Sequence, residues 1–289
     1  MAVAPERSSA SAQRLDGIIA LALSASAVAQ SDDAAALDQH LDSVDPDFLG
    51  FAVEGAGMGL TLLDRRSPVE PSRLRRLQKG RWLRFVPLAY AGAGLGLAEL
   101  GQAVIPYVED EKVLTAWFAI DGYAFHLTLL APEDHLDGQA VPPELSGPAA
   151  MVFDQGVARC IWFNAAAEPG AIGAIVGRFP PQRQADLWSG VGLAATYAGG
   201  LDPDGLAELR KLSGPHAAML ASGSVFASWL RVLGENEVPG NRTACQALTG
   251  MTIDEAAELC LVERRATSGE SIEDFLGWHG RVRQALAGR

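Results

Sequence analysis

Six ionisable side chains lie within apolar stretches of this sequence and have types suited to acid–base chemistry. They are Glu54, Asp121, His126, Asp154, Arg159 and Asp186. An unpaired charge in an apolar segment is costly, so these groups are expected to pair, to titrate abnormally or to line a cavity. A buried carboxyl with a raised pKa can donate a proton, a histidine can relay it, and an arginine can fix a neighbouring acid. We therefore expect the six to form a catalytic site.

Each of these residues also has a structural explanation. Glu54 and Asp121 each precede a glycine and could serve as caps or turn residues. His126 could be a hydrogen-bonded core histidine. Asp154 and Arg159 are five positions apart and could form a plain ion pair. The sixth residue, an aspartate, could cap the helix that follows it.

Glycine-rich phrases surround these residues. The phrase "AYAGAGLGLAEL" (89–100) returns in similar form as "LWSGVGLAATYA" (187–198), and "EGAGMGLTLLD" (54–64) follows the same pattern of glycines. The neighbouring alanines and leucines are good helix formers, which predicts three helices with smooth glycine faces. Each interior glycine costs about 0.5–1 kcal/mol relative to alanine. Close approach of two helix backbones, or a flat ligand lying on bare backbone, would offset that cost.

The second of these explanations predicts a long, flat, apolar slot for a substrate. Its expected glycines are Gly55, Gly92, Gly94, Gly190 and Gly192. Its expected aromatic residues are Tyr90, Tyr123, Phe125, Trp162, Trp188 and Tyr197. The same aromatic side chains could instead belong to the hydrophobic core.

Recurring landmarks predict an internal duplication. Glu54-Gly55 aligns with Gln155-Gly156, and "DGYAF" (121–125) aligns with "SGSVF" (222–226), both 101 residues later. Near-constant spacing of this kind indicates two repeats. A polar residue present in only one repeat is then not required by the fold that the repeats share and is a candidate for function. The six ionisable residues are of this kind.

We expect one all-α domain over residues 1–289. It would contain repeats at 49–148 and 149–248, an N-terminal helix at 13–48 and a C-terminal helical extension at 249–289. Helical periodicity marks further segments within it. They are 34–44, 110–130, 169–179, 204–212, 216–233, 253–265 and 271–286. The segment 131–148 is rich in helix breakers and is predicted to be the loop between the repeats.

Composition excludes several classes of protein. The formal net charge is −12, and the one cationic stretch, 73–84, has the spacing of a solvated helix face, so no nucleic-acid partner is expected. Familiar signatures such as HExxH, the P-loop and paired CxxC are missing, so no metal and no cofactor is predicted. His135, among acids, is expected in a solvated loop. Cys160 and Cys245 lack an evident base and are expected to be buried thiols.

The N-terminal stretch "GIIALALSASAVAQ" (17–30) mimics a secretory signal. However, Asp16 accompanies Arg14, and the strongly apolar part is short. We therefore expect an amphipathic first helix and a cytoplasmic location.

Four phrases resemble a known family. "FAVEGAGMGLTLLD" (51–64), "AIDGYAFH" (119–126), "FDQGVARCIWF" (153–163) and "ADLWSGVGLAATYAGG" (185–200) are similar to the bacterial UnbL-like family of unknown function. That family is associated with enediyne polyketide gene clusters. The resemblance covers about residues 49–248 and implies a bacterial protein of specialised metabolism that meets a long conjugated polyene.

Two functions follow as hypotheses. The first is a cofactor-independent enzyme that isomerises, cyclises or dehydrates an apolar polyene or polyketide intermediate. The second is a non-catalytic binding or assembly protein that shelters such an intermediate for partner enzymes. Both hypotheses use one pocket between the repeats.

Overall fold

The computed structural model describes residues 9–69 and 71–287, and these residues form helices and no strand. The expected all-α class is therefore confirmed. The α-helices are α1 (Ala10–Ala29), α2 (Ala34–Asp42), α3 (Pro46–Arg66), α4 (Val86–Glu99), α5 (Ile105–Glu111), α6 (Phe118–Leu130), α7 (Pro148–Asn164), α8 (Pro169–Val176), α9 (Pro181–Tyr197), α10 (Pro203–Ser213), α11 (Ala217–Leu233), α12 (Pro239–Thr249), α13 (Ile253–Arg265) and α14 (Ile272–Ala287). Short helical turns are η1 (Arg73–Gln78), η2 (Gly80–Phe85), η3 (Leu114–Trp117), η4 (Glu133–Asp137) and η5 (Gly214–His216).

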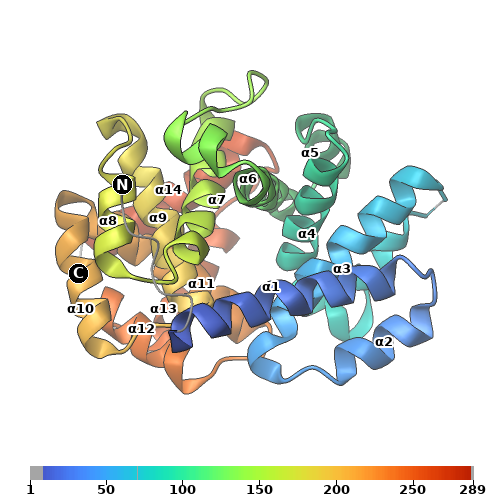
Figure 1. Cartoon of the computed structure of the whole chain (residues 1–289), viewed down its shortest axis with the longest axis horizontal. Helices are drawn as coiled ribbons and strands as arrows, with labels where there is room; N and C mark the ends of the chain where they lie inside the picture. Colours follow the sequence, from blue (N-terminus) through green and yellow to red (C-terminus); the bar gives the residue numbers. More distant parts are fainter. Residues whose placement is uncertain (1–8, 70, 288–289) are drawn as a thin grey trace.

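Six helices, α3, α4, α6, α7, α9 and α11, form a ring. Each packs against the next in this order, and residues from all six line one small central cavity. Arg231 on α11 closes the ring by donating to the carbonyl oxygen of Asp47 on α3 at 2.8 Å. The rings of Phe51 on α3 and Tyr197 on α9 also meet there, 5.1 Å between centroids. Helix α1 lies along α3, while α12, α13 and α14 pack on α11 (Figure 1).

Glycines bring the backbones of successive ring helices into direct contact. A methyl group at Gly92 on α4 would overlap the carbonyl oxygen of Glu54 on α3. One at Gly94, also on α4, would overlap that of Ala119 on α6. No side chain fits between such helices, so glycine is required by close approach rather than by an unusual backbone angle.

The same contacts recur in the second half of the ring. Gly190 on α9 faces the carbonyl oxygen of Gln155 on α7, and Gly192 faces that of Leu220 on α11. These residues stand 98 or 101 positions after Gly92, Gly94 and their partners, which is the spacing of the aligned sequence phrases. The recurrence supports a relation between the halves, and the internal duplication stays a prediction.

Two expected helices are divided. The segment 110–130 is interrupted after α5 because Lys112 adopts a left-handed conformation, φ 50°. The region 13–48 contains α1, α2 and the first residues of α3, with Asp32 at φ 60° in the turn between α1 and α2. A periodic pattern does not show a single-residue turn of this kind, and both of these residues are charged rather than glycine.

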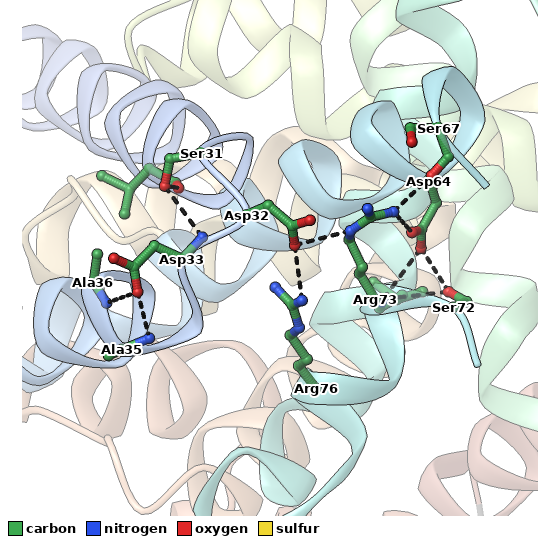
Figure 2. Close-up of polar contacts among 12 residues, drawn as sticks. Ser31, Asp32, Asp33, Ala35, Ala36, Asp64, Ser67, Ser72, Arg73 and Arg76 are labelled. Carbon is green, nitrogen blue, oxygen red and sulfur yellow. Dashed lines mark hydrogen bonds and ion pairs between the residues drawn. The ribbon is translucent and has the colours of Figure 1, made fainter. Parts of the chain in front are cut away.

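The cationic stretch 73–84 is folded into η1 and η2 rather than into one solvated helix. The guanidinium of Arg73 bridges Asp32 and Asp64, at 2.9 Å and 3.0 Å, and Arg76 also binds Asp32 (Figure 2). Ser72 donates to Asp64 at 2.7 Å in the same network. The network ties the turn after α1 to the end of α3.

Helix α1 is the one helix of the described chain that is long and apolar enough to cross a membrane by length and composition. A helix of a soluble protein or a signal sequence passes the same test. Here it is held at both ends. Gly55 and Gly59 of α3 contact the carbonyl oxygens of Ala22 and Ser26, and Arg14 donates to the carbonyl oxygen of Ala198 at 2.7 Å.

Candidate functional site

Three of the predicted ionisable residues form one buried cluster. Arg159, on α7, donates through Nη2 to Glu54 Oε1 on α3 at 2.9 Å and through Nη1 to Asp121 Oδ1 on α6. All three side chains are largely removed from solvent, since their exposed fractions are 11%, 7% and 4%. The prediction that these residues lie together is therefore supported by direct contacts between three helices.

Charge in this cluster is not balanced. Two carboxylates share one guanidinium, which leaves a formal charge of −1 in a buried place. Burial is the largest influence on Asp121 and raises its pKa, whereas the charge and hydrogen bond of Arg159 oppose that rise. Burial alone would lower the pKa of Arg159, but the two carboxylates outweigh it and raise that pKa. Arg159 therefore stays charged, and Asp121 takes up a proton more readily than an exposed aspartate does.

The cluster stands between two cavities. The central cavity of the ring has a volume of about 30 Å³ and is lined by all three cluster residues. That is roughly the space of one or two water molecules. The second cavity, which we call the apolar pocket, has a volume of about 260 Å³. Both cavities are lined by Phe51, Glu54, Arg159 and Phe163.

The apolar pocket lies between α1 and the first four helices of the ring. Its apolar lining is Ile18, Ile19, Ala22, Leu23, Phe51, Met58, Leu95, Phe125, Leu129, Leu130 and Phe163. Leu23 and Leu130 are 54% and 62% exposed, so they mark its mouth. The ring of Phe125 lies under the guanidinium of Arg159, 5.2 Å from the ring centroid to Cζ.

A second acid–base pair lines the same pocket. His126 Nε2 lies 2.7 Å from Glu99 Oε2, and the histidine is buried while the glutamate is 43% exposed. Sequence reasoning identified His126 but missed Glu99. The sequence did hold a sign of this role, because Glu99 is the one charged residue of the apolar phrase 89–100. A charged residue at the end of a helix is common, however, and does not by itself indicate a functional site. The pair can carry a proton between the pocket and solvent.

Asp154 and Asp186 lie apart from this cluster and line neither cavity. Asp154 pairs with Arg183 on α9, which contacts both of its carboxylate oxygens, instead of with Arg159. Residues five apart on a helix point about 140° away from each other, so an ion pair between Asp154 and Arg159 on α7 would have been strained. Asp186 Oδ1 lies 4.0 Å from Arg283, and burial raises the pKa of Asp186 to about 6.

All five predicted substrate glycines face helix backbone. A methyl group at Gly55 would overlap the carbonyl oxygen of Ala22, and the other four meet Glu54, Ala119, Gln155 and Leu220 in the same way. These contacts fit close helix packing, which was the alternative to a ligand on bare backbone. The glycines position the site but are covered by neighbouring helices.

The predicted aromatic residues divide into two groups. Phe125 lines the apolar pocket and Tyr197 lines the central cavity. The other four are buried in the core and line neither. Of these, Trp162 donates to the carbonyl oxygen of Gly199 at 3.1 Å, and Tyr90 donates to Glu111 at 2.8 Å.

Residues set aside by the sequence analysis are also buried. His135 is buried beside Phe153 with Nδ1 2.9 Å from the carbonyl oxygen of Ala140, where a solvated loop was expected. Cys160 and Cys245 are buried thiols, and burial raises the pKa of both. Within residues 9–69 and 71–287, no group of three or more His, Cys, Asp or Glu side chains is arranged to hold a metal ion.

Comparison with known proteins identifies a family for this chain. The model of a protein family described as "Protein of unknown function (DUF1702)" matches residues 5–286, which is nearly the whole chain. No curated protein and no solved structure matches this chain.

Proposed function

We propose that this chain, which belongs to DUF1702, a family of proteins of unknown function, binds an elongated apolar molecule in the apolar pocket and moves protons on it. The proposal rests on the position of the cluster of Arg159, Glu54 and Asp121. Glu54 and Arg159 form the inner wall of a pocket whose other walls are largely apolar, and Asp121 lies behind them and lines the central cavity. Electrostatic interactions are stronger in such a place than in water, so a carboxyl there acts strongly on a bound molecule.

The residues suit a reaction in which a proton is given and another is taken. Glu54, which lines the apolar pocket, takes a proton from the bound molecule and returns one to it. Asp121, whose pKa burial raises, exchanges protons with Glu54 across the central cavity that both line, while Arg159 holds both carboxyls in place. His126 and Glu99 then exchange protons with solvent at the other wall. Double-bond isomerisation and cyclisation need this pair of transfers, and dehydration needs a proton for the departing hydroxyl. General acid–base catalysis of this kind contributes roughly 10²–10⁴ in rate.

The resemblance to the UnbL-like family suggests the substrate. A conjugated polyene of polyketide origin, as in enediyne pathways, is long, flat and apolar. Such a molecule matches the aromatic and aliphatic lining of the pocket, in which Phe125 and Phe163 meet edge to face at 5.3 Å. The proposed setting is the bacterial cytoplasm, beside the enzymes that make and consume the polyene.

Substitution of the carboxyls tests the enzymatic proposal. Purified protein is incubated with a soluble conjugated polyene, and product is followed by absorption and by mass. We expect Glu54→Gln and Asp121→Asn each to lower turnover at least about 10²-fold. The matched control is Asp64→Asn, because Asp64 is a half-buried ion-pair partner on the same helix as Glu54 but about 15 Å further along it.

Full turnover in both carboxyl variants would exclude the proposed roles. Asp154→Asn distinguishes two roles for this residue. The sequence predicts a catalytic aspartate, whose loss would lower turnover, whereas the ion pair with Arg183 in the structure indicates a structural role that leaves turnover unchanged in folded protein. Melting temperatures of all the variants show whether a loss of turnover reflects loss of folding.

A binding protein is the second candidate. Only Glu54, Glu99, His126 and Arg159 are ionisable among the residues of the pocket, and its remaining lining is apolar. A sheltering protein would bind the polyene in a fixed ratio and shift its absorption band without product. It would also keep binding after Glu54→Gln, whereas an enzyme would lose turnover.

A further inference from the structure

The ionisable groups of the apolar pocket restrict the kind of ligand that it can take. Helix α1 contributes only apolar side chains to the lining, while α3, α4, α6 and α7 each contribute one ionisable residue. These four are Glu54, Glu99, His126 and Arg159. The end of a ligand that reaches the inner pocket therefore meets two carboxyl side chains, one histidine and one arginine, and these four groups determine whether that end can carry a charge.

Arg159 is not free to hold an anion. Two of the five N–H groups of its planar fork already donate to Glu54 and Asp121, and these two carboxylates together outweigh its single positive charge. A carboxylate or phosphate is normally gripped by two parallel hydrogen bonds from such a fork. An anionic ligand that reached the remaining N–H groups would lie beside both carboxylates, in a cluster whose formal charge is already negative.

His126 is similarly engaged. Its Nε2 lies 2.7 Å from Glu99, so even a protonated ring is neutralised by its own partner. Two carboxyls, Glu54 and Glu99, line the pocket beside one arginine and one histidine, and a third, Asp121, lies behind Arg159. The formal charge of these five groups is −1 with a protonated histidine and −2 with a neutral one, so the pocket holds no uncompensated positive charge.

From this arrangement we infer that the apolar pocket accepts a chain whose inner end is uncharged, such as a hydrocarbon, alcohol or carbonyl, and rejects the matching carboxylate. Glu54 and Glu99 determine this specificity. An anion entering the pocket would lose its hydration and gain no cationic partner, which is selection by repulsion rather than by a new contact. The inference depends on the proposed function, because it assumes that this pocket binds the ligand.

Two probes of equal chain length test the inference. Dodecan-1-ol and dodecanoate compete with the neutral fluorescent dye Nile red at pH 8, where the acid is ionised. We expect the alcohol to displace the dye at a concentration at least about tenfold lower than the acid. Glu54→Gln and Glu99→Gln each remove one carboxylate. Both variants should therefore bind dodecanoate more tightly and reduce the ratio of the acid concentration to the alcohol concentration needed to displace the dye.

A control variant and three outcomes make the test decisive. Asp64→Asn removes a carboxylate of α3 outside the pocket and should leave the ratio unchanged. Equal binding of alcohol and acid, or a ratio unmoved by Glu54→Gln in folded protein, would overturn the inference and leave the proposed function standing. Failure of both probes to displace the dye would overturn the proposed function and the inference with it.

Discussion

The two halves of the ring share their backbone contacts and differ in their charges. Helices α3, α4 and α6 approach one another at Gly92 and Gly94, and α7, α9 and α11 do so at Gly190 and Gly192. The side chains that follow this frame diverge. Glu54 and Asp121 stand in the first half where Gln155 and Ser222 stand in the second, and Arg159 stands where the first half has Met58.

This difference separates packing from chemistry. What the halves share is used to bring helices together, since every one of the four glycines meets a carbonyl oxygen of a neighbouring helix. What they do not share is concentrated at one place, because Glu54, Asp121 and Arg159 come from three helices and meet beside the apolar pocket. A buried cluster with unbalanced charge lowers the stability of the fold, whereas the same cluster beside a cavity is suited to proton transfer.

Arg159→Met should have the largest effect, because it makes this position of the second half like Met58 of the first. Two carboxylates would then stay buried without a cation, and breaking a buried ion pair by removing one partner costs about 3–5 kcal/mol. Urea unfolding measures the loss. The triple variant Glu54→Gln, Asp121→Asn, Arg159→Met should recover most of it, and no recovery would show that Arg159 acts chiefly through packing.

Matched glycine substitutions come next. Gly94→Ala and Gly192→Ala each push a methyl group into a carbonyl oxygen of the adjacent helix, and overpacking of this kind costs about 1–3 kcal/mol. The two losses should be similar if the halves are built alike. Gly17→Ala on α1 is the control, since nothing lies within 4 Å of the added atom, and it should stabilise the helix slightly. A loss of stability at only one of Gly94 and Gly192 would show that the two halves do not pack in the same way.

Asp186→Asn comes last, because its effect on stability depends on pH and is small in acid. Burial raises the pKa of Asp186 to about 6 from an ordinary 3.8, so its ionised form is disfavoured in the folded protein. Stability from this carboxyl is complete below pH 3.8 and is lost as the pH rises through 6. At pH 7 the asparagine variant should therefore be more stable, by up to about 3 kcal/mol at roughly 1.4 kcal/mol for each tenfold change in proton affinity.

Thermal unfolding of both proteins at pH 4 and pH 7 measures this difference. His279, whose pKa burial lowers to about 3, gives an opposite slope between pH 6.5 and 3, but it is present in both proteins and cancels. An equal difference at the two pH values would show that ionisation of Asp186 is not the cause.

The sequence predicted what depends on local pattern. The all-α class followed from periodicity and from good helix formers around the glycines, and α13 has the predicted bounds, 253–265. Ionisable residues within apolar runs pointed to Glu54, Asp121 and Arg159 because burial of a charge requires a partner.

What the sequence could not show depends on contacts between helices. Asp154 was paired with Arg159 from spacing alone, whereas its partner Arg183 lies on another helix. Glu99 was missed because only its contact with His126, 27 residues away, places it at the pocket. The turn at Lys112 was hidden because a lysine gives no local sign of the left-handed backbone conformation that it adopts.

Direct backbone contact between the ring helices has a kinetic consequence. With no side chains between them, these helices have nothing that can rotate aside to widen the pocket, and separating them would break many contacts at once. A molecule therefore passes Leu23 and Leu130, whose exposed side chains change rotamer within picoseconds to nanoseconds. We therefore expect a ligand of the apolar pocket to exchange without a slow opening step, so that its residence time depends on its contacts with the pocket lining.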